Sequence, residues 1–174
     1  FYGDEIEEIE MLEIETGKPI KKMDVAAVFP ANLYVAPKDK LQEIIRTIEH
    51  ELQEHESYLE TENKFLEAKR IHERTQFDLE MIKELGYCTG IENYSRFFDG
   101  REPGARPFCL LDYFPDDYLM MIDESHATIP QIRGMWGGDR SRKVNLVNYG
   151  FRLPSAMDNR PLNFNEFETL INQV

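Results

Sequence analysis

The chain has 174 residues, 41% of them hydrophobic and 30% charged, which predicts one globular domain, or one domain and a piece of another. Its formal net charge of −13 argues against a general nucleic-acid binder, and no apolar run approaches roughly 18 residues, so we expect neither a transmembrane helix nor a membrane partner. The two cysteines, Cys88 and Cys109, predict reduced thiols in a cytoplasmic protein, and the absence of Met at Phe1 predicts a fragment of a longer chain.

Residues 1–30 are expected to form a β-hairpin. Two strands, roughly Ile6–Glu13 and Pro19–Phe29, flank the sequence ETGKP, in which Gly17 supplies the positive φ of a tight turn. Because a hairpin alone is only marginally stable in water, we expect it to belong to a larger sheet whose other strands precede Phe1.

Residues 38–85 have the apolar spacing of two helices separated by the polar sequence ETEN, and Gly86 is expected to end the second. The apolar stripe recurs at intervals of three, four or seven residues and consists of Leu41, Ile44, Ile45, Ile48, Leu52 and Leu59, then Phe65, Ala68, His72, Thr75, Leu79 and Ile82. This spacing favours an antiparallel helical pair. A partner-binding helical arm is the alternative.

The second half of the chain mixes loops with shorter elements. Residues 86–108 are rich in Gly, Arg and aromatic side chains and have no core-like period. A turn at Pro115–Asp117 precedes a short apolar run, Tyr118–Ile122, which is typical of a strand buried on both faces. A helix is predicted after Pro130, with an interruption around residues 137–138, and a Pro-rich loop then leads to an amphipathic helix near the end of the sequence.

Asp123, Glu124, Ser125 and His126 directly follow the apolar run. In open α/β sheets, ligands lie beyond the carboxyl ends of the strands, where an Asp can hold Mg²⁺, usually through water, and an adjacent Glu can polarise an attacking water. Nucleoside triphosphatases use this arrangement at their magnesium site. The alternative is that both acids cap a helix that begins near Thr128, because a helix N-terminus favours carboxylates.

The sequence lacks the phosphate-binding partner of that motif. The pattern G-x-x-x-x-G-K-[ST] does not occur, and the only Gly-Lys pair is followed by Pro19 in the predicted hairpin turn. The chain therefore has the magnesium end of a nucleotide site without its phosphate loop.

Positive charge gathers locally despite the acidic total. The stretch from Gln131 to Arg152 sets a single carboxylate, Asp139, against the cations Arg133, Arg140, Arg142, Lys143 and Arg152. Local charge is what a phosphate group meets. Residues 90–96 and 149–162 mix Arg with aromatic side chains, which suits base stacking and phosphate contact. Ordinary loop packing with solvated arginines is the alternative.

The chain resembles the UvrB family, a component of the bacterial UvrABC excinuclease, in three long stretches: EAKRIHERTQFDLEMIKELGYCTGIENYSR, PFCLLDYFPDDYLMMIDESHATIPQIRGMWGGDRSRK and YGFRLPSAMDNRPLNFNEFE. That family is a superfamily 2 helicase-like ATPase of nucleotide excision repair. The resemblance implies an α/β fold in which residues 1–30 are the C-terminal hairpin of the UvrA-binding domain. Residues 31–113 would be a helical insertion domain, and residues 114–174 a partial RecA-like motor segment.

The resemblance also implies roles for single residues. Asp123 would hold the Mg²⁺ of MgATP through water, Glu124 would activate the hydrolytic water, and His126 would couple the nucleotide state to the rest of the motor. The implied DNA-binding residues are Tyr34, Arg74, Tyr87, Glu92, Phe151 and Arg152. Trp136 and Gly137 depart from the Tyr and Asn that the family commonly shows, a change that is confined to a nearby loop surface.

The implied cofactors, ATP and Mg²⁺, and the implied partners, UvrA, UvrC and damaged DNA, belong to the full-length protein. UvrA delivers the DNA in that family, and UvrC is recruited for incision. We expect this fragment alone to bind no cofactor and to hydrolyse no ATP, because it lacks the phosphate loop. Two other classes stay open: a protein-docking module in which residues 123–126 only cap a helix, and a fragment of a generic superfamily 2 helicase.

Overall fold

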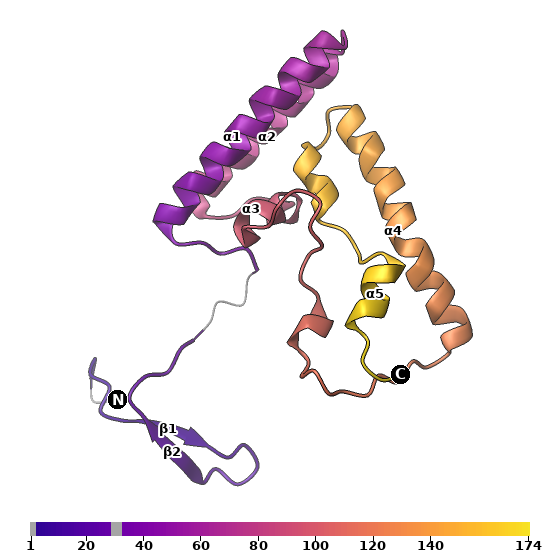
Figure 1. Ribbon diagram of the computed structural model, residues 1–174. Helices are drawn as coiled ribbons and strands as arrows, with labels where there is room; N and C mark the ends of the chain where they lie inside the picture. Colours follow the sequence, from indigo (N-terminus) through magenta and orange to yellow (C-terminus); the bar gives the residue numbers. More distant parts are fainter. Residues whose placement is uncertain (1–2, 29–32) are drawn as a thin grey trace. The chain divides into compact units, whose positions relative to one another are not determined.

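The computed structural model describes residues 3–28 and 33–174, which fall into two compact units, Phe1–Leu33 and Tyr34–Val174 (Figure 1). The first unit contains a small β-hairpin, and the second is mainly helical. The domain boundary predicted between residues 30 and 31 lies outside the described residues. The boundary predicted between residues 113 and 114 falls inside the second unit and stays a prediction.

The hairpin of the first unit consists of two antiparallel strands, β1 (Ile9–Leu12) and β2 (Pro19–Met23). Gly17 has a φ of 66°, and its N–H donates to the carbonyl of Glu13 at 2.8 Å, so the predicted turn is confirmed. The strands are shorter than predicted, and residue 29, the predicted end of the second, lies outside the described residues. Nearly every side chain of the ladder is exposed, because two strands alone bury no apolar face.

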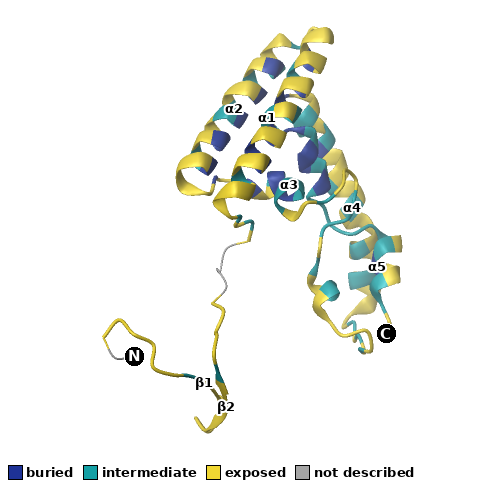
Figure 2. Ribbon diagram, turned by 60° about the vertical axis from the view of Figure 1, so that its left-hand side comes forward, coloured by how far each residue is buried: buried dark blue, intermediate teal, exposed yellow. Residues whose placement is uncertain are grey.

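The second unit is built on two antiparallel helices, α1 (Lys38–Thr61) and α2 (Phe65–Leu85), which confirms the helical pair predicted from the apolar spacing. Lys83 pairs with Glu49, and His72 with Glu56, as antiparallel neighbours do. Gly86 ends α2 with a φ of 71°. The facing stripes form the core, dark blue in Figure 2, which includes Ile44, Ile45, Ile48, Leu52, Leu59, Ala68, Ile71, Leu79 and Ile82.

A compact loop region joins the core of the helical pair. It consists of the short helices η1 (Ile91–Tyr94) and α3 (Ser95–Asp99) and of η3 (Pro154–Asp158), which contacts both. The side chains that it adds to the core are Cys88, Ile91, Tyr94 and Leu153. Segments far apart in the sequence therefore pack together beside α1 and α2.

Helix α4 (Ser125–Asn148) is continuous, so the predicted start after Pro130 and the predicted interruption are wrong. Pro130 is only the sixth residue of the helix, where it removes one hydrogen bond, to the carbonyl of His126. A glycine costs a helix about 1 kcal/mol relative to alanine, which tertiary contacts can offset. One such contact places the Arg133 guanidinium 3.6 Å from the centroid of the Phe164 ring.

Helix α5 (Phe164–Leu170) confirms the amphipathic helix predicted near the end of the sequence. A capping box starts it: the Asn163 side chain accepts the N–H of Glu166 at 2.9 Å, and the Glu166 carboxylate accepts the N–H of Asn163 at 2.9 Å. In the described ranges, no helix is both long and apolar enough to cross a bilayer.

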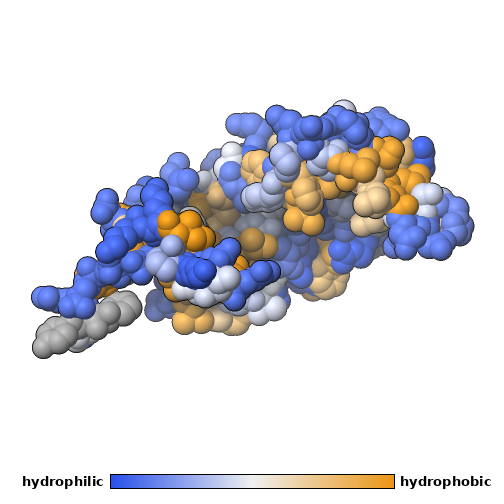
Figure 3. Space-filling model, turned by 90° about the horizontal axis from the view of Figure 1, so that it is seen from below, coloured by the Kyte–Doolittle hydropathy of each residue, from blue (hydrophilic) through white to orange (hydrophobic). Residues whose placement is uncertain are grey.

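The predicted strand Tyr118–Ile122 does not form. Within the described residues, this segment makes one parallel bridge, between Leu119 and Gln173, and the Met120 N–H donates to the Gln173 carbonyl at 2.8 Å. A strand needs neighbouring strands, and the described chain supplies none here, so Leu119 and Met121 stay 62% and 86% exposed. The view from below in Figure 3 shows hydrophobic surface, in orange, gathered on its right-hand side. The helical part of the predicted fold is present, and the RecA-like sheet stays a prediction.

Candidate functional site

The acidic motif lies in a turn at the start of α4, and its backbone is strained. Glu124 has a φ of 49° and a ψ of 45°, in the left-handed region that such a residue rarely adopts. The Glu124 carbonyl accepts the N–H groups of Ala127 and Thr128 at 2.8 and 3.0 Å, and the Asp123 carbonyl accepts the Thr128 hydroxyl at 3.1 Å. Strain of this kind, of about 1–3 kcal/mol, gathers at functional sites.

The side chains of the motif are exposed, and they do not cap the helix as the alternative requires. Asp123 Oδ1 accepts the N–H of Glu124 at 2.9 Å, and the Glu124 carboxylate lies 3.2 Å from Nδ1 of His126. The Glu124 side chain makes no capping hydrogen bond. The helix also begins at Ser125, ahead of Thr128. The structure therefore differs from the arrangement in which both acids cap a helix near Thr128.

Asp123 and Glu124 carry the oxygen donors that Mg²⁺ prefers. Mg²⁺ usually takes one or two protein carboxylates and completes its shell with water and substrate phosphates, so an exposed pair fits it together with a nucleotide. In the part of the chain that the structure describes, no group of three or more His, Cys, Asp or Glu side chains could hold a metal ion. The residues fit a magnesium–nucleotide complex, and the roles assigned to Asp123, Glu124 and His126 stay predictions.

A basic pocket lies along the second half of α4. It has a volume of about 460 Å³, and four cationic side chains face two carboxylates in its lining, which consists of Glu92, Asn93, Asp139, Arg142, Lys143, Leu146, Arg152, Asn159, Arg160 and Pro161. At about 1.5 Å per helical residue, Leu146 lies roughly 30 Å along the helix from the acidic motif. The local excess of positive charge expected from the sequence is thus concentrated in one concave site.

Ion pairs hold the cations of the basic pocket in place. Lys143 is 5% exposed, its Nζ lies 2.8 Å from the Asp139 carboxylate, and it also donates to the carbonyl of Asn159. Arg160 binds Glu166 through both guanidinium nitrogens, at 2.8 and 2.9 Å. These hydrogen bonds raise the pKa of Arg160 and lower that of Glu166.

We expect Glu166→Gln to make the stability of the chain less sensitive to acid. Hydrogen bonds from Arg160 hold the pKa of Glu166 below its usual 4.5, so its contribution is complete at neutral pH and is lost as the pH falls through that value and below it. The variant should start about 1 kcal/mol less stable at neutral pH and then lose less stability on acidification. Thermal midpoints measured between about pH 7 and pH 3 test this expectation.

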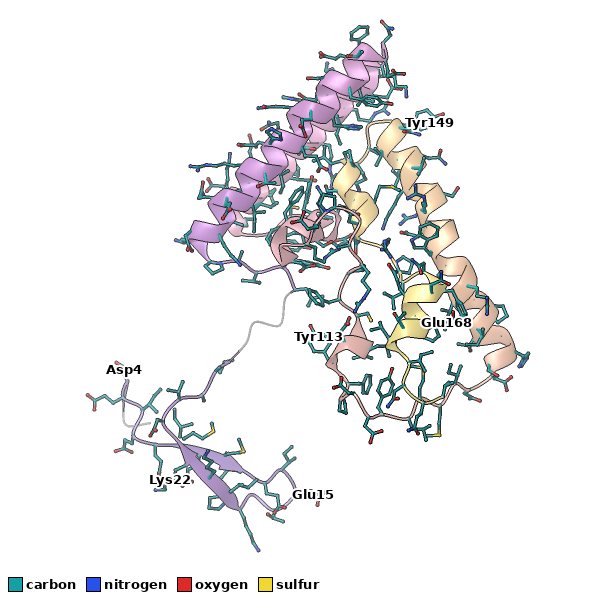
Figure 4. The ribbon with its side chains drawn as sticks, in the orientation of Figure 1. Asp4, Glu15, Lys22, Tyr113, Tyr149 and Glu168 are labelled. Atoms are coloured by element: carbon teal, nitrogen blue, oxygen red, sulfur yellow. The ribbon has the colours of Figure 1, made fainter. Side chains whose placement is uncertain are left out.

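The matched control is Glu168→Gln, at the exposed Glu168 of the same helix (Figure 4). It removes the same charge without touching Arg160, so its midpoint should follow that of the unsubstituted chain at every pH. Parallel acid curves for Glu166→Gln and the unsubstituted chain would contradict the ion pair.

Four of the six predicted DNA-binding residues gather around Cys88. Tyr87 precedes it directly and is 51% exposed. Arg74 of α2 donates to the buried carboxylate of Asp78 at 3.1 Å. Burial raises the pKa of the Cys88 thiol to about 12, and the charged side chains near enough to act on it are Asp78, Arg74, Glu92 and Arg152. Of these, Glu92 and Arg152 also line the basic pocket.

The other two predicted DNA-binding residues are aromatic, and protein covers them in part. The Arg70 guanidinium lies 4.4 Å from the centroid of the Phe151 ring and donates to the carbonyl of Tyr149, at the end of α4 (Figure 4). Phe151 remains 45% exposed. Tyr34 packs edge-on against Phe98 with ring centroids 6.1 Å apart, and burial raises its pKa. Phe151 therefore offers an accessible ring, whereas Tyr34 also takes part in packing.

The sequence does not single out every residue of the pocket. Arg142 and Lys143 belong to the basic stretch noted above, but nothing in the sequence assigns them to a site. Arg160 reaches the pocket through its pairing with Glu166, six residues later, which is the one local signal that could have found it.

Comparisons with known proteins give this geometry a context. Residues 39–100 match the family model of the UvrB third helical domain. The chain is also 62% identical over 173 residues to UvrABC system protein B of Cytophaga hutchinsonii, 58% identical over 174 residues to that of Chlorobium phaeobacteroides, and 55% identical over 174 residues to that of Bacteroides fragilis. From end to end, the chain is similar to UvrB. The predicted resemblance is confirmed.

The alignments cover 99–100% of this chain but only 25–26% of the UvrB relatives, so the chain spans about a quarter of their length. The UvrB family model covers α3, α2 and almost all of α1, and with them Arg74, Tyr87 and Glu92. Asp123, Glu124, Phe151 and Arg152 lie outside that model and are covered by the longer UvrB alignments.

Proposed function

We propose that the chain is a segment of a DNA-repair ATPase that verifies damaged DNA in nucleotide excision repair. The observation that carries this proposal is the similarity to UvrB, at 55–62% identity over essentially the whole chain. An alignment of this extent includes the acidic motif and the candidate DNA contacts together.

The proposed nucleotide chemistry belongs to the start of α4. Asp123 would hold Mg²⁺ through water, Glu124 would polarise the attacking water, and His126 would pass the nucleotide state to the rest of the motor. Bound Mg²⁺ would neutralise charge that develops on the phosphates of ATP. The exposed carboxylates and the strained backbone of Glu124 support these roles. Because the sequence lacks G-x-x-x-x-G-K-[ST], we propose that this segment alone hydrolyses no ATP.

The proposed DNA path follows the basic pocket and the aromatic rings. The cations of the pocket suit backbone phosphates, and the half-exposed rings of Tyr87 and Phe151 suit base stacking. Glu92, a carboxylate beside these cations, can accept hydrogen bonds from base amino groups. Arg74, Arg152 and Tyr34 complete the proposed set.

The proposed partners are UvrA, UvrC and damaged DNA, in the cytoplasm. Residues 1–30 would belong to the UvrA-binding domain and residues 31–113 to a helical insertion. Residues 114–174 would belong to a RecA-like motor domain whose remaining strands would cover the exposed run Tyr118–Ile122.

Exchange of segments tests the proposal. Residues 1–174 would replace the matching quarter of the Cytophaga hutchinsonii protein, in cells without their own copy. We expect this chimera to restore survival after ultraviolet damage, and we expect Arg46→Met, at an exposed position of α1, to leave survival unchanged. Asp123→Asn in the same chimera should abolish it.

The rival classes give other results. If the segment were a docking module, Asp123→Asn would restore survival as well as the unsubstituted chimera. A stably expressed chimera that restores no survival would refute the role in excision repair.

A further inference from the structure

Three charged side chains meet in the interior, away from the acidic motif. Arg96, in the first turn of α3, donates from Nη1 to Oδ2 of Asp158 at 2.7 Å and from Nη2 to Oε1 of Glu51 at 3.3 Å. The three side chains are only 10–14% exposed. We call Arg96, Glu51 and Asp158 the Arg96 cluster.

The carboxylates of the Arg96 cluster also bind the backbone of other segments. Glu51 Oε1 accepts the N–H of Ser155 at 2.9 Å, and Asp158 Oδ1 accepts the N–H of Gly104 at 3.0 Å. Arg101 donates to the carbonyl of Asp158 at 3.2 Å. The cluster therefore links α1, α3, η3 and the loop after α3 through directional hydrogen bonds.

The linked segments are those that carry the candidate DNA contacts. Glu92 lies in η1, which runs directly into α3, and Arg152 lies three residues before Ser155. The elements η1 and η3 contact each other, and Glu92 and Arg152 line the same pocket. The position of Arg152 relative to Glu92 thus depends on how η3 is held against α3.

Buried charges of this kind contribute more to geometry than to stability. Burial is the main cause that raises the pKa of Glu51, so its ionised form is costly where it lies. Apolar side chains of similar volume often stabilise a protein as well as a buried ion pair does, but they cannot fix a backbone N–H in one direction. Both ends of the Arg96 guanidinium are occupied by the cluster, so Arg96 is not itself a contact for a ligand.

We infer that Arg96 is a positioning residue for the proposed DNA interface, which it serves by fixing η3, and with it Arg152, against the segment that carries Glu92. The inference rests on the proposed function. It assigns to Arg96 an effect on DNA that passes entirely through Arg152.

The test compares Arg96→Met, Arg96→Lys, Arg152→Ala and the double variant of Arg96→Met with Arg152→Ala in the 174-residue chain. Arg46→Met, which removes an exposed cation of α1, is the matched control. Binding of a labelled single-stranded oligonucleotide is measured at two salt concentrations by fluorescence anisotropy. Hydrogen exchange of residues 104 and 153–158 is measured in parallel, well below the thermal midpoint of each variant.

We expect Arg96→Met to speed exchange of the Gly104 and Ser155 amides by about tenfold or more, because both lose an ordered acceptor. It should weaken oligonucleotide binding as much as Arg152→Ala does and lower the salt slope by about one phosphate contact. The double variant should bind no more weakly than either single one. Arg96→Lys, which keeps the charge and one arm, should recover part of both readouts, and Arg46→Met should change neither.

Two failures can be told apart. Losses that simply add in the double variant, or unchanged exchange in Arg96→Met, would overturn the positioning role while the DNA interface stands. If the unsubstituted chain binds no oligonucleotide, the proposed interface itself falls, and the inference falls with it. Arg96→Lys keeps the test decisive if Arg96→Met fails to fold, because a folded Lys variant with normal exchange and binding would also contradict the inference.

Discussion

Replacing Gly150 with alanine should lower the free energy of unfolding by about 3 kcal/mol or more, although it adds only one methyl group. Gly150 follows α4 with a φ of 69°, which costs an L residue about 1–2 kcal/mol. A Cβ at this position would also lie 2.2 Å from the carbonyl oxygen of Glu67 and 2.8 Å from its Cα. These are backbone atoms of α2, which cannot move aside as the tip of a side chain can.

The matched control is Gly137→Ala, inside α4, where an added Cβ meets nothing within 4 Å. Alanine suits a helix better than glycine by about 0.5–1 kcal/mol, so this variant should be more stable than the unsubstituted chain. At about 2–4 °C per kcal/mol for a chain of this size, Gly150→Ala should lower the thermal midpoint by at least about 6 °C, whereas Gly137→Ala should raise it slightly. Shifts of the same sign would contradict the close approach of Gly150 to α2.

The helical pair could be predicted from the sequence because its signal is local. The apolar residues of α1 and α2 recur at the spacing of one helix face, and Gly86 ends the second helix with the positive φ that glycine tolerates. The turn of the hairpin is local in the same way, since Gly17 alone supplies its geometry.

The errors concern elements whose form depends on tertiary contacts. Helix α4 passes through Pro130 and Gly137 because contacts such as that of Arg133 with Phe164 hold it, and no local pattern reveals them. The run Tyr118–Ile122 has the composition of a buried strand, but strand formation needs partners that the described chain does not supply.

The candidate sites divide along the same line. The acidic motif could be recognised because four consecutive residues carry it. The basic pocket could not, because it joins Glu92 to Arg152 and depends on Arg160, which Glu166 holds. The Arg96 cluster is less visible still, since its members are separated by 45 and 62 positions in the sequence.

Glu124→Gln should reduce ATP turnover by about 10²-fold or more in the chimera that supplies a phosphate loop, and it should leave MgATP binding nearly unchanged. Under the proposed roles Glu124 polarises only the attacking water, and Gln is close to it in shape but is a much weaker base. Asp123→Asn removes a charge from the Mg²⁺ shell, so it should weaken MgATP binding as well as turnover. Steady-state ATPase rates and MgATP titrations separate the two roles.

A capping role for Glu124 predicts a different outcome. Loss of a capping side chain costs about 0.5–2 kcal/mol of stability and leaves the chemistry of the folded enzyme intact. Because the Glu124 side chain makes no capping hydrogen bond, we expect the thermal midpoint of Glu124→Gln to stay close to that of the parent chimera. Normal turnover together with a lowered midpoint would end the catalytic assignment.

Glu124→Gly separates strain from chemistry. Glycine adopts the φ of 49° found at this position without the steric penalty that Glu carries, so the variant should gain about 1 kcal/mol in stability. It should also lose turnover as severely as Glu124→Gln, because the carboxylate is gone. A residue present for stability alone cannot give this pair of results, since its removal does not stabilise the fold. A stability gain with full activity would mean that the strain serves no reaction at this site, whereas a gain with lost turnover would tie the strained turn to hydrolysis.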